Sequence, residues 1–252
     1  MALVQEFNKT GKYLFRNRSF IPLILYPLAT LIILIERIHV LYHPDLLWSV
    51  VCFIISIAGL GVRALVIGYI PKRTSGRNRK KQMADSLNKT GIYSMVRHPL
   101  YLGNFLMWMG LIIYTGNFWF IIIAILLFWI YYERIMFAEE EYLRQKFGRE
   151  FELWAGETPA FIPAPGKWEK TDLKFSVKKA IRREHRGLFA VIISFVYLNL
   201  LKNLAVNQTF TLNNHWTVLL IMGILFFTAI RVIKSKTNLL TPQSDNARTK
   251  AN

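Results

Sequence analysis

The apolar residues of this chain fall in blocks rather than in an alternating pattern. The blocks lie over residues 20–42, 46–70, 100–114, 118–137, 187–206 and 215–233. Hydrophobic residues make up 53% of the 252 residues, which is too apolar for an ordinary soluble domain. A block of about 18 apolar residues or more can cross a bilayer as a helix. The sequence therefore predicts an all-α, polytopic membrane helix bundle with about six transmembrane helices, of which 100–114 is the shortest.

The charged residues lie between these blocks and predict the orientation. The net charge is +17, and the basic residues concentrate near the N-terminus, in 72–81 and in 144–186. The turns on the other side contain Asp45 but neither Lys nor Arg. By the positive-inside rule, both termini and both long basic loops are expected in the cytosol. We interpret the basic residues as topology signals and contacts with anionic phospholipids, not as a nucleic-acid surface.

The organisation expected from these patterns has five parts. They are an N-terminal helix pair (1–70), a core (71–166), a basic amphipathic segment (167–186), a C-terminal helix pair (187–233) and a polar tail (234–252). In the amphipathic segment Leu173, Val177 and Ile181 repeat every four residues among basic residues, which is typical of a helix on the membrane surface. A helix packed on its own protein has the same pattern, and both interpretations stay open.

Cysteine and histidine usage restricts the chemistry further. Cys52 is the only cysteine, so no intrachain disulfide can form. His39, His185 and His215 lack metal-ligand spacing with any partner, so no metal is expected. The sequence leaves the oligomeric state open.

Two polar clusters flank the apolar hairpin of the core. The first foot is Gly91-x-Tyr93-x-x-x-Arg97-His98-Pro99-x-Tyr101-x-Gly103, and the second foot is Glu139-Glu140-x-x-Leu143-x-x-x-Phe147-Gly148. The hairpin turn, Thr115-Gly116-Asn117, lies about midway between them. Both feet must therefore return to the same side of whatever the hairpin spans.

The first foot has the features of an anion site. Pro99 suits the first turn of a helix, which places Arg97 and His98 at the N-terminus of that helix. Free backbone amides and the positive end of the helix dipole favour an anion there. The alternative is a positive-inside anchor, with Arg97 on lipid phosphates.

The second foot offers negative charge. The last hairpin helix meets no breaker before Phe147-Gly148, and it places Trp129, Glu133 and Glu140 on one face, with Glu139 about 100° around the axis. Carboxylates at the end of a membrane helix are costly unless they are hydrated or paired. A ligand with an anionic and a cationic end would fit between the two feet, and S-adenosylmethionine is such a ligand.

The two feet, in this order and followed by Ile162-Pro163, resemble the isoprenylcysteine carboxyl methyltransferase and phospholipid methyltransferase superfamily over roughly residues 70–163. These are integral membrane enzymes that use S-adenosylmethionine. The resemblance implies that His98, Tyr101 and the Leu102-Gly103 backbone hold the methionyl part of the cofactor, with Glu140 on its ammonium group. It implies further cofactor-binding roles for Tyr93 and Pro163, with Pro159–Pro163 beside the adenine, and catalytic roles for Arg97 and Glu139.

Two departures from the family pattern affect the substrate. The carboxyl methyltransferases usually have an arginine where this chain has Ile135, and the nearest basic residue is Arg134. Their prenylcysteine carboxylate site is therefore not carried over. The two further spans, with Trp154-Ala155 and Thr158–Pro163, look like a bacterial branch in which lipid A phosphate methylation is one known activity. This resemblance implies a bacterial inner membrane, with the active site open to the cytosol.

The expected function is methyl transfer to the head group of a membrane lipid, with O-methylation of a carboxylate or phosphate favoured. Such an acceptor is ionised at neutral pH and needs no general base, whereas an amine would need one, such as Glu139. The basic cytosolic face, together with Arg37, Arg63 and Arg134 inside or near spans, suits an anionic head group.

Three alternatives remain. The first is a phospholipid N-methyltransferase, and the second is an NAD(P)H-dependent sterol-type reductase of similar fold. The counterpart motif of the reductases tends to have Asn in place of Pro99 and Asp in place of Asn104. The third is a non-enzymatic lipid-binding or transport protein, which has no need of a cofactor pocket open only to the cytosol.

Overall fold

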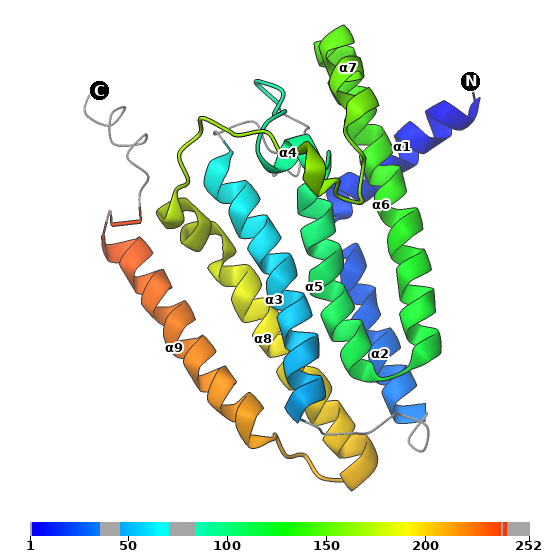
Figure 1. The fold of residues 1–252 in the computed structure, drawn as a ribbon. Helices are drawn as coiled ribbons and strands as arrows, with labels where there is room; N and C mark the ends of the chain where they lie inside the picture. Colours follow the sequence, from blue (N-terminus) through cyan, green and yellow to red (C-terminus); the bar gives the residue numbers. More distant parts are fainter. Residues whose placement is uncertain (1, 36–45, 71–83, 238, 241–252) are drawn as a thin grey trace. The chain divides into compact units, whose positions relative to one another are not determined.

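The computed structural model describes residues 2–35, 46–70, 84–237 and 239–240, and these residues are mainly helical. The elements are α1 (Ala2–Asn17), η1 (Ile21–Ile24), α2 (Leu25–Ile35), α3 (Leu46–Tyr69), α4 (Ile92–Met95), α5 (Pro99–Thr115), α6 (Phe118–Phe147), α7 (Arg149–Glu157), η2 (Pro165–Lys167), α8 (Val177–Asn207) and α9 (Asn214–Lys236) (Figure 1). The predicted all-α class is confirmed.

Helix length tests the predicted spans. Within the described ranges, α3, α6, α8 and α9 are each long and apolar enough to cross a membrane. The segment from α1 through α2 passes the same test as one span bent by 76°, and α5 is a shorter apolar helix of 17 residues. The structure thus supports four or five spans by length, against about six predicted. Parts of the prediction fall on 36–45, 71–83 and 241–252, which lie outside the described residues.

Internal contacts divide the chain into two compact units. The first unit comprises 1–28, 70–102 and 122–173, and it contains α1, α4, α7 and most of α6. The second unit comprises 29–69, 103–121 and 174–252, and it contains α3, α8, α9 and most of α5. The two feet of the hairpin lie in the first unit, except for Gly103 at the end of the first foot.

In the second unit α8 packs against both α3 and α9 (Figure 1). Close helix approach occurs at Gly59, where an added Cβ would lie 2.5 Å from the Gly103 carbonyl and 2.6 Å from the Met107 amide nitrogen. Only a residue without a side chain fits at such a crossing. By contrast, among the described residues nothing lies within 4 Å of a Cβ added to Gly61 of the same helix.

The first turns of α8 form part of the amphipathic segment expected over 167–186. Helix α8 begins after its N-cap Ser176 and continues through Arg186 without a break. Its Glu184 is buried and binds Arg63 of α3 through Nε–Oε2 (2.9 Å) and Nη2–Oε1 (3.0 Å) contacts. This ion pair binds the end of the segment to α3, whereas Leu173 and Val177 of the apolar repeat are exposed, so both interpretations of the segment stay open.

A second polar cluster ties α8 and α9 to the last turn of α5. The buried Lys202 donates from Nζ to the carbonyl oxygen of Tyr114 (2.8 Å). The Tyr114 hydroxyl accepts from Asn199 Nδ2 (3.2 Å) and Trp216 Nε1 (3.1 Å). A cation beside the last carbonyls of a helix satisfies unpaired acceptors and the negative end of its dipole. The C-terminal helix pair therefore stabilises the hairpin near its turn.

Replacing Lys202 by Met keeps the length of the side chain but leaves the Tyr114 carbonyl without its donor. Loss of a buried charged hydrogen bond should lower the free energy of unfolding by roughly 1–3 kcal/mol. Thermal unfolding in detergent checks this, with Lys236→Met, an exposed lysine in the last turn of α9, as the control. Equal melting temperatures for the two variants would contradict a stabilising role for Lys202.

Candidate active site

The first foot is joined to the chain segment that follows α7. Three backbone hydrogen bonds connect them: Arg97 N to Pro159 O (2.9 Å), His98 N to Ala160 O (3.1 Å) and Ala164 N to Met95 O (3.0 Å). Gly91, with φ of 65°, turns the chain into α4, and Pro99 begins α5 as predicted. The loop between α4 and α5 is thus bound to the 159–164 segment at Met95, Arg97 and His98.

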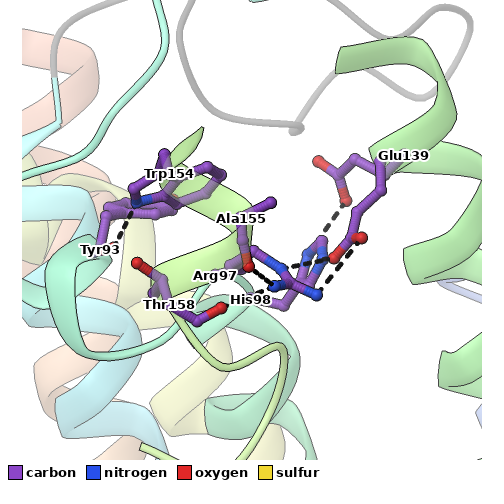
Figure 2. A network of polar contacts seen from close by, with 8 residues as sticks. Tyr93, Arg97, His98, Glu139, Trp154, Ala155 and Thr158 are labelled. Atoms are coloured by element: carbon purple, nitrogen blue, oxygen red, sulfur yellow. Dashed lines mark hydrogen bonds and ion pairs between the residues drawn. The ribbon is translucent and has the colours of Figure 1, made fainter. Parts of the chain in front are cut away.

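Arg97 connects this loop to α6 and α7 (Figure 2). Its Nε donates to Glu140 Oε1 (2.8 Å), and its Nη2 donates to Glu140 Oε2 (3.4 Å). Its Nη1 donates to the carbonyl oxygens of Ala155 (2.5 Å) and Thr158 (2.6 Å) at the end of α7. The guanidinium therefore binds a carboxylate on one side and two carbonyls on the other.

His98 and Tyr101 bring the second glutamate into the same network. His98, which is 6% exposed, places Nε2 2.8 Å from Glu140 Oε1 and Nδ1 3.8 Å from Glu139 Oε2. Its ring stacks on Tyr101, with centroids 5.6 Å apart, and the Tyr101 hydroxyl donates to Glu139 Oε2 (2.7 Å). The two feet therefore meet, as the midway hairpin turn predicted.

The charges of the two feet pair with each other. The sequence predicted one ligand with its anionic end at the N-terminus of α5 and its cationic end near the end of α6. In the structure, the anion at the N-terminus of α5 is Glu140 itself, bound by Arg97 and His98. An ionised carboxylate has about four lone-pair sites. A ligand ammonium group could therefore share Glu140 with its present partners.

Tyr93 lies against α7 at the edge of the network. Its carbonyl oxygen accepts from the indole Nε1 of Trp154 (3.1 Å), as Figure 2 shows. Burial, together with the negative charge of Glu139, raises the pKa of the Tyr93 phenol well above its usual value. The phenol therefore stays neutral across the physiological range and can act only as a neutral hydrogen-bonding group.

The other predicted residues have different settings. Leu102 lies in the first turn of α5, where its amide donates to the His98 carbonyl (3.2 Å). Gly103 packs on α3, where an added Cβ would lie 2.6 Å from Arg63 Cγ, so helix packing alone accounts for the glycine. Pro163 immediately precedes Ala164, which pairs with the α4 end of the first foot. Trp129 and Glu133 are exposed, although they share a helix face with Glu140.

Sequence reasoning missed two kinds of contact. The carbonyls of Ala155 and Thr158 bind Arg97, but backbone groups leave no signal in residue identity. Tyr132 of α6 is buried and its ring lies 5.1 Å from that of Tyr101. Its spacing of seven residues from Glu139 places both on one helix face, and this periodicity could have identified it. Among the described residues, no group of three His, Cys, Asp or Glu side chains could hold a metal ion.

Comparison with known proteins places these features in a family. A family model of phospholipid methyltransferases matches residues 45–150, which contain both feet. Protein-S-isoprenylcysteine O-methyltransferase B of Arabidopsis thaliana is 30% identical over 153 residues, which cover 55% of this chain and 73% of the relative. The protein-S-isoprenylcysteine O-methyltransferase of Schizosaccharomyces pombe is 36% identical over 73 residues, which cover 29% and 31%.

A third relative carries a different name. The nickel-cobalt-cadmium resistance protein NccN of Alcaligenes xylosoxydans xylosoxydans is 34% identical over 112 residues, which cover 44% of this chain and 50% of the relative. The chain thus spans half or less of the fission-yeast and Alcaligenes relatives. No solved structure matches the chain. With the Arabidopsis relative covered over 73% of its length, and with both motifs inside the matched region, the chain belongs to the isoprenylcysteine O-methyltransferase and phospholipid methyltransferase superfamily of membrane methyltransferases.

Proposed function

We propose that this protein uses S-adenosylmethionine to methylate the head group of a membrane lipid, with a carboxylate or phosphate oxygen as the acceptor. The observation that carries the proposal is the network in which Arg97 and His98 contact Glu140 while Tyr101 contacts Glu139. These are the residues to which the family resemblance assigns the cofactor. Membership of a methyltransferase family supports the reaction class, and a bacterial inner membrane with the site on the cytosolic side is part of the proposal.

The donor set of the network suits this cofactor. Two adjacent glutamates present negative charge that favours an ammonium group and a sulfonium. His98, Tyr101 and the first-turn backbone of α5 at Leu102 and Gly103 would hold the methionyl part, and Tyr93 and Pro163 would lie further along the cofactor. Bound S-adenosylmethionine supplies an electrophilic methyl group for in-line transfer to the acceptor oxygen.

The residues of the chain contribute mainly by positioning and electrostatics. Alignment of the acceptor with the methyl group, and exclusion of water, supply much of the rate of such a transfer. An ionised oxygen acceptor needs no proton removed, so Glu139 acts through its charge beside the cationic cofactor. With an amine acceptor Glu139 would instead have to take a proton, and this second candidate function, N-methylation, predicts a different product.

Arg97 is a positioning residue in this proposal. All three of its guanidinium nitrogens bind either Glu140 or the carbonyls of Ala155 and Thr158. It therefore fixes the orientation of the Glu140 carboxylate. It also fixes the position of the end of α7, from which the chain continues into the 159–164 segment. The role is narrower than the catalytic one expected from the resemblance.

Removing the charge of Glu140 tests the cofactor site. Glu140→Gln should weaken binding of S-adenosylmethionine to the detergent-purified protein about tenfold or more, because a charged hydrogen bond to the ammonium group is lost. Calorimetry measures this, with Glu141→Gln as the control, since Glu141 hydrogen-bonds to Arg144 and Gln145 of its own helix and lies outside the network. Absence of binding by the well-folded wild-type protein, or binding of NADPH instead, would contradict the proposal.

Arg97→Lys should weaken S-adenosylmethionine binding about tenfold while leaving the KM for the acceptor unchanged. A lysine keeps the charge but cannot bind a carboxylate and two carbonyls in one plane. The matched control is Arg144→Lys, an exposed arginine paired with Glu141. If S-adenosylmethionine binding weakens and the KM for the acceptor rises to the same extent, Arg97 has a general structural role rather than one in positioning Glu140.

The product distinguishes O- from N-methylation. With methyl-labelled cofactor and a lipid extract, the labelled product should have gained one methyl group and lost one negative charge relative to its precursor. Anion-exchange separation followed by mass spectrometry measures both changes. A labelled product that keeps all its negative charge and carries the methyl group on nitrogen would support the phospholipid N-methyltransferase alternative.

A further inference from the structure

Most hydrogen-bond donors of the first foot are already used within the protein. The backbone amides of Arg97 and His98 donate to carbonyls of the 159–164 segment, at 2.9 and 3.1 Å. The amides of Tyr101 and Leu102 both donate to the His98 carbonyl, at 3.1 and 3.2 Å. The carboxylate of a bound S-adenosylmethionine would therefore need a donor further along α5.

Asn104 carries the next polar side chain of α5. Between Pro99 and Met107 the only polar side chains are those of Tyr101 and Asn104. The Tyr101 hydroxyl already donates to Glu139 (2.7 Å). Asn104 follows Tyr101 by three residues, so the two share one face of the helix, and its side chain is half-buried. Asn104 is thus the first side-chain donor of α5 beyond the glutamate network.

Arg63 of α3 determines which way the Asn104 carboxamide lies. Its Nη1 donates to Asn104 Oδ1, while its Nε and Nη2 bind Glu184 of α8 at 2.9 and 3.0 Å. The reversed amide would place the Nδ2 hydrogens against those of the guanidinium, because both groups are donors. Among the described residues, Asn104 Nδ2 has no hydrogen-bond partner. The amide therefore presents an unused donor on the side away from Arg63.

Glu184 holds the Arg63 guanidinium in place. The two side chains are 5% and 20% exposed, and a bidentate pair of this kind has a specific geometry. Gly103 permits the close approach of α3 and α5, since an added Cβ would lie 2.6 Å from Arg63 Cγ. Glu184 lies outside residues 45–150, which the family model matches. Helix α8 therefore adds to the family core a contact that fixes a side chain of α5.

We propose that Asn104 Nδ2 donates a hydrogen bond to the carboxylate of bound S-adenosylmethionine, and that Arg63 and Glu184 are positioning residues for this amide. The inference rests on the proposed function and adds a cofactor-binding residue to it. A hydrogen bond from an amide to a carboxylate is charge-assisted and therefore stronger than one between neutral groups. Arg63 also balances the charge of Glu184, which would otherwise repel the ligand carboxylate.

Binding of two cofactors to the full-length protein in detergent tests the role of Asn104. Decarboxylated S-adenosylmethionine lacks only the carboxylate. Asn104→Leu should weaken binding of S-adenosylmethionine about tenfold and that of the decarboxylated compound less than twofold, because only the first loses a charge-assisted hydrogen bond. Asn104→Asp keeps an oxygen for Arg63 but repels the ligand carboxylate, so it should weaken S-adenosylmethionine further. Asn214→Leu, an exposed residue at the start of α9, is the control.

Arg63→Lys tests the positioning role. A lysine cannot bind Glu184 through two nitrogens and Asn104 through a third. The variant should therefore weaken S-adenosylmethionine severalfold while changing the decarboxylated compound less than twofold. In the Asn104→Leu background the same substitution should change neither affinity further, because Arg63 acts through Asn104. Arg186→Lys, an exposed arginine of α8, is the control.

The outcomes separate this inference from the proposed function. A wild-type protein that binds neither compound refutes the proposed function, and the inference falls with it. Wild-type binding of S-adenosylmethionine with an unchanged affinity in Asn104→Leu, or with equal weakening of both compounds, overturns the inference alone. If Asn104→Leu fails to fold, Asn104→Asp decides, since it keeps the contact with Arg63, and a wild-type preference for S-adenosylmethionine over the decarboxylated compound in that variant overturns the inference. Equal effects of Arg63→Lys in both backgrounds would overturn its positioning role.

Discussion

The contact between Arg97 and Glu140 is the interaction on which the candidate site depends. It joins residues 43 positions apart, at the start of α5 and near the end of α6. Partly buried charges lose hydration, and the loss is offset only when their remaining hydrogen-bonding groups are also satisfied. Here the guanidinium of Arg97 also donates to the carbonyls of Ala155 and Thr158, and the carboxylate of Glu140 also contacts His98. One side chain thus determines how the α4–α5 loop, α6 and the end of α7 meet.

Features with local causes could be predicted from the sequence. Pro99 begins α5, Thr115 ends it, and α6 continues to Phe147 before Gly148, as helix-start and helix-stop signals indicated. The convergence of the two feet followed from the position of the hairpin turn. The assignments of Arg97, His98 and Glu140 to one site depended on the family resemblance, and the network shows that these side chains are in contact.

Features set by distant partners could not be predicted in the same way. The pairing of Glu184 in α8 with Arg63 in α3 joins residues 121 positions apart. Likewise, Gly59 and Gly61 look alike in the sequence, yet within the described residues Gly59 packs against another helix and Gly61 does not. Which face of a helix meets its neighbour is set by packing rather than by residue type.

The two adjacent glutamates have different environments, which implies different tasks. Glu140 contacts Arg97 and His98, so much of its negative charge is balanced and its orientation is fixed. Glu139 accepts a hydrogen bond from the neutral Tyr101 hydroxyl, and its contact with His98 is longer, at 3.8 Å. Its charge is therefore less compensated, and it exerts the stronger field on a cationic ligand group nearby. The same field disfavours an anionic acceptor, so a site that uses Glu139 to attract the cofactor needs a separate cation for the acceptor.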